Sequence, residues 1–277
     1  MGSSWSDLER PPLVPAALAA AVVRPGALWT RLEVVDEAGS TNADLLVAAT
    51  AGAPEGTVLV AEAQYAGHGR LGRQWVSPPR AGLTFSMLLR PGDPPAAVPV
   101  PRWGWLSLLV GLSLHRAVCR LGAADAVLKW PNDLLLGPDR HKAAGILAQA
   151  AAGAVVLGVG LNVSTRRTEL PRADATSLAL ENAACTDRAP LLRAVLRQID
   201  ADYRGWRAVG GDPERSGLLA AYVEVCDTIG RPVTALLPDG RTLAGIATRV
   251  DLDGRLELHT EAGELHAVAA GDIVHLR

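Results

Sequence analysis

The chain has 277 residues, with 27 basic and 29 acidic side chains and a formal net charge of −2, which argues against a protein whose main partner is a nucleic-acid backbone. Hydrophobic residues make up 49% of it, enough for a real core, and its length predicts one large or two unequal domains. Three widely spaced cysteines and six histidines form no CxxC pair or zinc pattern, which excludes a disulfide framework and fits the reducing cytoplasm.

Lysine is nearly absent from the chain. Of the 27 basic residues only Lys129 and Lys142 are lysines, and the others are arginines. A chain that uses arginine wherever any cation suffices keeps lysine where a compact ammonium is needed. Both lysines are therefore candidate functional residues.

The first 226 residues predict alternating helices and strands. A tail and one helix occupy residues 1–30, and Ser40 as an N-cap predicts a second helix from Thr41. Further helices are expected at 103–121, 191–206 and 214–225, and strands at 57–63, 82–90, 127–130, 134–136, 144–149 and 155–163. The uncharged stretch 143–163 is long enough to cross a bilayer, but Gln149 and its glycines favour two core strands joined at Ala152-Gly153.

From Gly230 onward the pattern changes to short alternating segments. Hairpin signals at roughly ten-residue spacing predict a small β-barrel or sandwich; they are Pro238-Asp239-Gly240, Asp253-Gly254, Ala262-Gly263 and Gly271-Asp272. We expect a tail and helix at 1–34, a catalytic domain at 35–228 and a small β domain at 229–277.

The loop from Gly67 to Arg73 contains GxGxxG, yet a dinucleotide site would need a helix directly after it. Pro78-Pro79 follow instead, and neither lysine follows a glycine as a P-loop requires. The glycines let a ligand approach the backbone closely, and Arg70 and Arg73 offer forked donors to phosphate or carboxylate. A mobile arginine-rich surface loop is the alternative, and the adjacent Trp75 is either a stacking surface or a core anchor.

Two further segments carry candidate chemistry. Lys129-Trp130-Pro131-Asn132-Asp133 joins a cation, an amide and a carboxylate, and Asp133 suits Mg²⁺ beside phosphate; a plain Asn-Asp turn is the alternative. Lys142 precedes a buried strand, where its ammonium suits an anion that changes charge during a reaction, although a solvated flanking lysine fits too. Asn162 ends the next strand as a polar residue or a turn former.

These motifs together resemble those of biotin protein ligases over roughly residues 35–277. The matching segments are Gly39-Ser40-Thr41-Asn42, Ala61-Glu62-Ala63-Gln64, the Gly67–Arg73 loop with Trp75, Lys129–Leu134, Lys142–Leu147 and Gly158–Asn162. The resemblance implies an α/β (α+β) catalytic domain with a mixed sheet like that of class II aminoacyl-tRNA synthetases, and a C-terminal SH3-like β-barrel.

The resemblance also implies an ATP-dependent reaction in two steps. Biotin is activated as biotinyl-5′-AMP and then passes to a lysine of biotin carboxyl carrier protein. ATP with Mg²⁺ and biotin are the expected substrates, with no tightly bound prosthetic group. A lipoate or octanoyl ligase or transferase and a non-catalytic biotin sensor are the alternatives.

Individual roles follow by matching positions to the family. The implied biotin contacts are Ser40, Thr41, Asn42, Gln64, Gly67, His68, Gly69, Arg70, Lys142 and Gly145. The implied ATP contacts are Arg73, Trp75, Lys129, Asn132, Asp133 and Asn162, with Asp133 as the Mg²⁺ ligand. Lys142, at biotin's carboxylate and the α-phosphate, and Arg70, which retains the adenylate, are the implied catalytic residues. His68 stands where many members have arginine, so its charge depends on pH.

The same comparison sets expectations about partners. The segment before Gly39 is too short for the N-terminal winged helix-turn-helix of bifunctional members. We therefore expect a monofunctional cytoplasmic enzyme, a monomer or weak homodimer, that binds no specific nucleic acid and no membrane.

Overall fold

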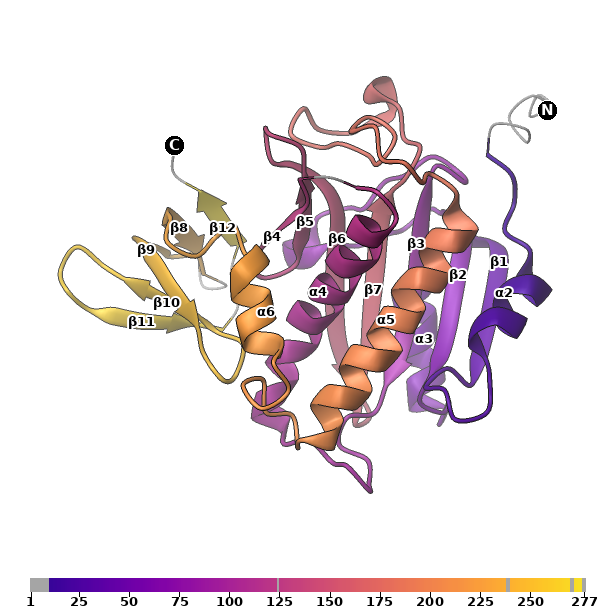
Figure 1. Ribbon diagram of the computed structural model, residues 1–277, viewed down its shortest axis with the longest axis horizontal. Coiled ribbons are helices and arrows are strands. Elements are labelled where there is room, and N and C mark those ends of the chain that lie inside the picture. Colours follow the sequence, from indigo (N-terminus) through magenta and orange to yellow (C-terminus); the bar gives the residue numbers. More distant parts are fainter. Residues whose placement is uncertain (1–9, 124, 238–239, 270–271, 276–277) are drawn as a thin grey trace.

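The computed structural model, shown in Figure 1, describes residues 10–123, 125–237, 240–269 and 272–275. Within them the larger part is built on a seven-stranded sheet of order β1-β2-β3-β7-β6-β5-β4. The strands are β1 (Arg31–Ala38), β2 (Thr57–Gln64), β3 (Gly82–Leu89), β4 (Val127–Lys129), β5 (Asp133–Leu136), β6 (His141–Ala151) and β7 (Ala154–Asn162). β1 and β2 are parallel and the other neighbours antiparallel, so the sheet is mixed, as predicted.

Helices cover both faces of this sheet. They are α2 (Pro15–Val22), α3 (Thr41–Thr50), α4 (Trp105–Arg120), α5 (Arg188–Ala208) and α6 (Leu218–Val225). In Figure 1, α4 and α5 cross in front of the sheet and α3 lies behind it. The arrangement confirms the predicted helix that starts at Thr41, where the Ser40 side chain accepts a hydrogen bond from the Ala43 amide.

The alternation of side chains along β7 explains where a pocket can form. Val155, Leu157, Val159 and Leu161 point into the main core with α4 and α5, whereas Val156 faces Leu45 and Ala49 of α3 in a smaller cluster. Gly158 and Gly160 follow Val156 on that second face, because successive side chains of a strand alternate. On the α3 face of the sheet, the end of β7 nearest Asn162 therefore carries no side chains and leaves space for a pocket.

Three helix boundaries and one strand differ from the predictions, and one ambiguity is resolved. The helix predicted at 191–206 extends from Arg188 to Ala208, and β1 was not predicted. The helix predicted from residue 103 begins at Trp105 after a 3-10 turn (Val100–Gly104), and the one predicted from 214 begins at Leu218, after Gly217 with φ +75°. The uncharged stretch forms the β6–β7 hairpin. None of the helices in the described residues is long and apolar enough to span a membrane.

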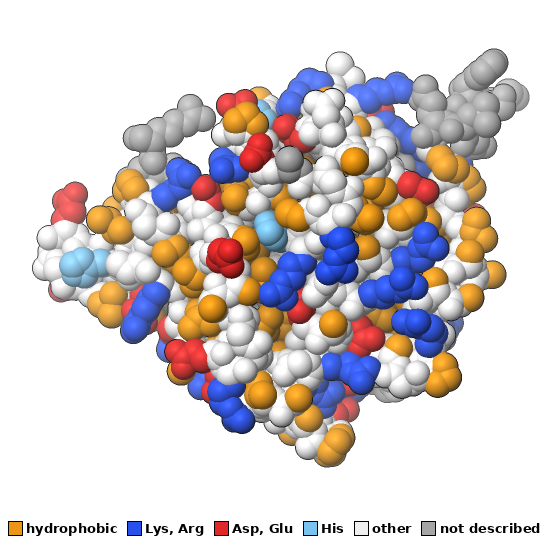
Figure 2. All heavy atoms as spheres, in the orientation of Figure 1, with side chains coloured by type: hydrophobic (Ala, Val, Ile, Leu, Met, Phe, Trp, Pro, Cys, Tyr) orange, Lys and Arg blue, Asp and Glu red, His pale blue; other side chains and the backbone are white. Residues whose placement is uncertain are grey.

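Arginines fasten the N-terminal part to α5. Figure 2, in which Lys and Arg side chains share one colour, shows basic side chains gathered over the side of the molecule that carries α5. Arg197 donates to the carbonyl of Ala21 at 3.2 Å, and Arg204 donates to that of Gly26. These two arginines therefore tie the end of α2 and the segment after it to α5.

The C-terminal part is a five-stranded antiparallel sheet of order β11-β10-β9-β8-β12. Its strands are β8 (Pro232–Leu236), β9 (Thr242–Val250), β10 (Leu256–His259), β11 (Leu265–Val268) and β12 (Asp272–His275). The predicted turns at 253–254 and 262–263 connect β9 to β10 and β10 to β11. The other two turn signals include residues 238–239 and 271, which lie outside the described residues.

The turn between β9 and β10 docks on the larger part. Trp105 Nε1 donates to the Asp251 carbonyl at 3.2 Å, and Trp130 Nε1 donates to the Gly254 carbonyl at 3.1 Å. Arg102 adds an ion pair with Asp253 at 3.2 Å. Both tryptophans are buried, so each indole N–H finds the partner that a buried donor requires.

Candidate functional site

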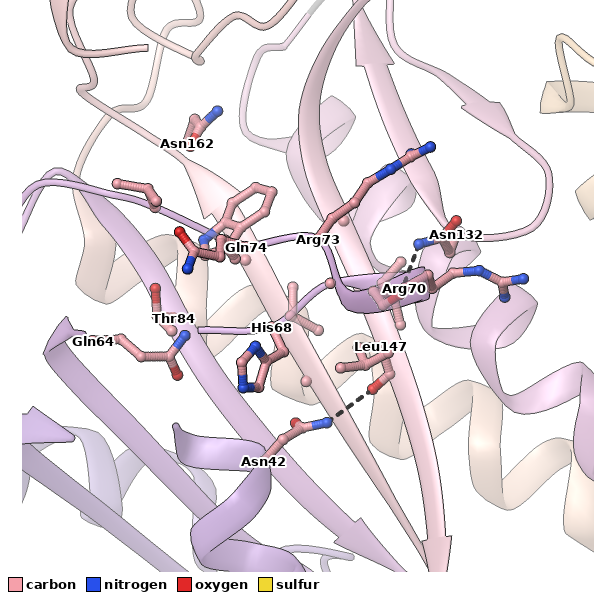
Figure 3. A pocket seen from close by; sticks show the side chains of 18 of the residues that line it. Asn42, Gln64, His68, Arg70, Arg73, Gln74, Thr84, Asn132, Leu147 and Asn162 are labelled. Atoms are coloured by element: carbon pink, nitrogen blue, oxygen red, sulfur yellow. Dashed lines mark hydrogen bonds between the residues drawn. The ribbon is translucent and has the colours of Figure 1, made fainter. Parts of the chain in front are cut away.

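A pocket opens on the α3 face of the sheet, where β6 and β7 meet the 67–76 loop and the start of α3. It encloses about 1080 Å³ of space including its open mouth. Every residue implied for biotin or ATP lines it except Gly67 and Lys129. Figure 3 shows Asn42 and Gln64 toward one end and Arg70, Arg73 and Asn132 toward the other.

The floor of the pocket is formed by glycines. The Trp75 and Asn42 side chains lie against the strands there and leave no room for a Cβ. Gly145 of β6 and Gly160 of β7 are register partners. A Cβ at Gly160 would lie 2.2 Å from the Trp75 ring, and a Cβ at Gly158 would lie 2.2 Å from Asn42 Oδ1. Trp75 is thus a wall of the pocket rather than a core anchor. Its Nε1 is buried with no hydrogen-bond partner in the described part of the chain, so this donor remains available to a ligand or water.

The end of the pocket near α3 is a connected polar network. Gln64 Oε1 accepts from the Thr41 amide at 2.9 Å, and the Thr41 and Ser86 hydroxyls lie 2.7 Å apart. Ser86 in turn donates to Asn42 Oδ1 at 2.6 Å, and Asn42 Nδ2 donates to Gln149 Oε1 at 2.9 Å. Because Thr41, Asn42 and Ser86 are buried, the network holds its donors and acceptors in fixed directions for a compact polar ligand.

Two members of this network, Ser86 and Gln149, were missed by the sequence analysis. Ser86 sits on a strand whose other residues, apart from Thr84, are apolar or glycine. Thr84 and Ser86 are two residues apart and so share a face of β3. Two hydroxyls at alternate positions of a buried strand were the signal that could have identified Ser86.

The other end of the pocket is cationic. Arg70, Arg73, Lys142 and Arg172 line it, and Asp133 is the sole acidic residue in the lining that the structure describes. Lys142 Nζ lies 2.6 Å from Asp133 Oδ1, with 35% and 18% of the two side chains exposed. Several cations against one carboxylate favour a ligand with more than one negative charge.

Arg172 was not among the predicted site residues. It lies in the loop that follows Asn162, and nothing in the local sequence distinguishes it from other loop arginines. Its guanidinium donates to both carboxylate oxygens of Asp174, at 2.7 and 2.6 Å, and these bonds lower the pKa of the Asp174 carboxyl. The pair is well exposed, so the arginine can exchange this partner for an anionic ligand at low cost.

The two asparagines implied for ATP have their amide donors occupied by the protein. Asn132 Nδ2 donates to the Ile146 carbonyl and Asn162 Nδ2 to the Thr176 carbonyl, each at 2.9 Å. The first bond joins the turn before β5 to β6, and the second joins the end of β7 to the loop after it. Both side chains border the pocket, yet their amides hold its walls in place.

Gly67 and Lys129 lie outside the lining for identifiable reasons. A Cβ at Gly67 would lie 2.6 Å from the Trp75 carbonyl oxygen, so this glycine lets the two ends of the loop close on each other. Lys129 is on β4 as the register partner of Asp133. It belongs to the hairpin that carries Asp133, and the Trp130 beside it is in the core.

Glu62, part of one matching motif, is also structural. It forms a buried ion pair with Arg188 of α5 and accepts a hydrogen bond from the Leu13 amide at 2.5 Å. Its neighbour Gln64, two residues along β2, lines the pocket.

The mixed sheet, the separate antiparallel sheet and a pocket with one polar and one cationic end define an α/β protein built to hold a polar organic group beside an anionic one. Comparisons with known proteins agree. Residues 40–165 match the Biotin/lipoate A/B protein ligase family and residues 228–276 the Biotin protein ligase C terminal domain. The chain is 44% identical to the biotin--[acetyl-CoA-carboxylase] ligase of Mycobacterium tuberculosis over 98% of both chains.

Two further relatives extend the comparison. The bifunctional ligase/repressor BirA of Escherichia coli is 34% identical over 74% of this chain and 62% of its own length. The biotin protein ligase of Aquifex aeolicus, solved in complex with biotin and ATP, has a TM-score of 0.71 and 26% identity over 90% of this chain and 100% of that one. The chain belongs to the biotin protein ligase family, which confirms the resemblance found in its motifs.

Proposed function

We propose that the chain activates biotin with ATP as biotinyl-5′-AMP and transfers the biotinyl group to a lysine of a biotin carboxyl carrier domain. One observation carries this proposal: a single cavity joins a fixed hydrogen-bonding network to a cluster of cations. The Mycobacterium tuberculosis relative, a biotin--[acetyl-CoA-carboxylase] ligase, supports the choice of substrate and of an acetyl-CoA carboxylase as the acceptor. The Aquifex aeolicus structure with biotin and ATP supports the choice of both ligands.

In the first step the polar network holds biotin by its ureido ring. Thr41, Asn42 and Gln64 supply the donors and acceptors, and the glycine floor under Trp75 receives the ring system. This position directs the biotin carboxylate toward Lys142. A carboxylate oxygen then attacks the α-phosphorus, the bond from that phosphorus to the bridging oxygen breaks, and pyrophosphate leaves.

The cationic end makes this attack possible. Carboxylate and triphosphate repel each other, and Lys142, Arg70 and Arg73 offset the repulsion and stabilise the charge that develops. Holding both substrates in one cavity supplies a large part of the rate by orientation. Lys142 starts from its ion pair with Asp133, which keeps the ammonium at the pocket wall until an anion competes for it.

A magnesium ion would enter with the nucleotide. The described residues contain no group of three His, Cys, Asp or Glu side chains that could hold a metal by themselves. Mg²⁺ commonly binds one or two carboxylates and takes its other ligands from phosphate and water, and Asp133 fits that pattern. The ion would neutralise phosphate charge, while Asp133 would orient it beside Lys142.

In the second step the carrier lysine attacks the acyl carbonyl as a neutral amine. A C–N bond forms, the C–O bond to the phosphate breaks, AMP leaves, and the amine releases its proton to solvent. The mixed anhydride is prone to hydrolysis, so water must be kept away until the acceptor arrives. His68, Gly69, Arg70 and Arg73 of the loop line the pocket together with Trp75, and we infer that this segment covers the adenylate.

Labelled transfer tests the proposal. The protein is incubated with ATP, Mg²⁺, a purified carrier domain and radiolabelled biotin, lipoate or octanoate in separate reactions. We expect label on the carrier in the reaction with biotin and in neither of the other two. Label with lipoate or octanoate instead would show a related ligase, which the shared family description makes the second candidate. Biotin binding without any transfer would show a sensor.

A further inference from the structure

A short segment outside the pocket bridges two separate parts of the fold. We call Arg10–Leu13 the N-terminal strap. At one end the Leu13 amide donates to Glu62 at 2.5 Å and Arg188 donates to the Pro11 carbonyl at 2.6 Å. At the other end Arg10 donates to Glu169 at 2.6 Å and to the Ser164 carbonyl at 3.1 Å.

The first anchor of the strap is rigid. Glu62 and Arg188 form an ion pair whose side chains are 4% and 6% exposed, between β2 and α5. Buried charges stay ionised only when paired and hydrogen-bonded, and the strap supplies two of the bonds that complete this pair. The segment is therefore fixed to both β2 and α5.

The second anchor is on a loop that forms part of the pocket. We call residues 164–175 the rim loop, because its Pro171, Arg172 and Ala175 line the pocket. The far end of this loop is held beside Lys142. The Lys142 amide donates to the Asp174 carbonyl, and the Thr176 amide donates to the Lys142 carbonyl, each at 2.8 Å.

The near end of the rim loop is tied by Glu169. Its Oε2 accepts hydrogen bonds from the Arg166 amide at 2.8 Å and from Arg10 at 2.6 Å. The Arg10 and Glu169 side chains are 15% and 25% exposed, more shielded than most surface pairs. Arg10 also lowers the pKa of the Glu169 carboxyl, chiefly through this hydrogen bond.

We propose that Arg10 is a positioning residue for the nucleotide: through Glu169 it holds the rim loop, and with it Arg172, at the cationic end of the pocket. This inference rests on the proposed function. Biotin affinity should depend little on Arg10, because Thr41, Asn42 and Gln64 are held by hydrogen bonds among α3, β2 and β3, and none of these bonds involves the described residues of the strap.

The test separates the two substrates. Arg10→Gln and Glu169→Gln each remove one charge of the pair. Arg31→Gln is the matched control, because Arg31 forms a 2.8 Å pair with Glu33 whose side chains are 68% and 48% exposed, and neither residue lines the pocket. For each variant we would measure the KM for ATP in biotin-dependent ATP–pyrophosphate exchange, the Kd for biotin by calorimetry, and the Tm.

We expect Arg10→Gln and Glu169→Gln to raise the KM for ATP about tenfold, within the usual range of coupling between sites. The Kd for biotin should stay within about twofold and kcat should be little changed, as expected when ground-state positioning is lost. The exchanged pair Arg10→Glu with Glu169→Arg should recover part of the ATP affinity, because it restores the ion pair but not the bonds to the Arg166 amide and the Ser164 carbonyl. Arg31→Gln should match the wild type.

Each other outcome is informative. Wild-type protein without biotin-dependent exchange would refute the proposed function itself. Exchange in the wild type with an unchanged KM for ATP in Arg10→Gln would overturn the role of the strap. An equal loss of ATP and biotin binding together with a lower Tm would also overturn it, since that pattern marks a general structural defect.

Discussion

Replacing Gly158 with alanine places a methyl group against the side chain that organises the polar end of the pocket. A Cβ at this position would lie 2.2 Å from Asn42 Oδ1 and 3.3 Å from Ser86 Oγ. Carbon and oxygen atoms do not pack this closely, so one of the groups must move by about 1 Å. β7 is paired with β3 on one side and β6 on the other, which leaves Asn42 as the group that yields.

The magnitude follows from the bonds that Asn42 makes. It is 6% exposed, accepts from Ser86 at 2.6 Å and donates to Gln149 at 2.9 Å. Without these bonds Asn42 is no longer held in the direction that meets biotin; two hydrogen bonds to the ligand lost in this way, at about 1 kcal/mol each, cost about 2 kcal/mol of binding, or roughly a 30-fold change in an equilibrium constant. We therefore expect the Kd for biotin to rise about 30-fold.

Calorimetric titration with biotin measures this change. Gly205→Ala is the control, because a Cβ on that residue of α5 meets nothing within 4 Å. It should bind biotin like the wild type and gain up to about 1 kcal/mol of stability from helix propensity. Wild-type biotin affinity in a folded Gly158→Ala variant would refute the assignment of this network to biotin.

Three further predictions follow from the site and the core. Lys142→Ala should lower biotin-dependent pyrophosphate release at least about 100-fold, because it removes a cation placed at the developing charge; near-normal release would remove Lys142 from the chemistry. Arg70→Gly should let the adenylate escape and label lysines of bystander proteins, detected by mass spectrometry, and labelling confined to the carrier lysine would contradict a retention role. Burial lowers the pKa of His115, so the unfolded chain binds its proton more readily and the free energy of unfolding should fall as pH drops below about 6.5. Urea titrations of His115→Gln should show a shallower loss over the same range, and an identical pH dependence would contradict this origin.

Much of the fold could be predicted because the pattern of apolar residues matches the burial of the elements. The strands around Thr57–Gln64 and Ala154–Asn162 are nearly continuous apolar runs, and both are buried in the sheet. The predicted helix boundaries were wrong where a turn has the same residue types as a helix, so composition does not distinguish the two. Gly217, in a left-handed conformation, separates the turn at 213–216 from α6.

Residues of the pocket could be proposed where they form short motifs, and less well where only the fold brings them together. The start of α3, the end of β2 and the start of β6 converge as the motifs implied. Ser86 and Gln149 are separated from Asn42 by 44 and 107 positions, and only strand register shows that they meet. Arg172 depends on the path of a loop, which no periodicity encodes.

Of the two lysines proposed as functional residues, Lys142 lines the pocket and Lys129 does not. Lys142 is the lysine that the pocket lining contains, and its backbone forms hydrogen bonds with Asp174 of the rim loop and with Thr176 directly after it. Lys129 is on the strand next to Asp133 and outside the lining. A residue type that is rare in a chain therefore indicated the site, but did not separate a residue in it from one that supports it.

Formation and consumption of the adenylate test the central claim most directly. The protein alone is incubated with biotin, Mg²⁺ and ATP radiolabelled at the α-phosphate, and the bound nucleotide is identified by chromatography before and after a carrier domain is added. We expect labelled biotinyl-5′-AMP held by the protein and its conversion to AMP as the carrier gains biotin. Biotinylated carrier without any labelled adenylate, or adenylate that the carrier cannot discharge, would contradict it.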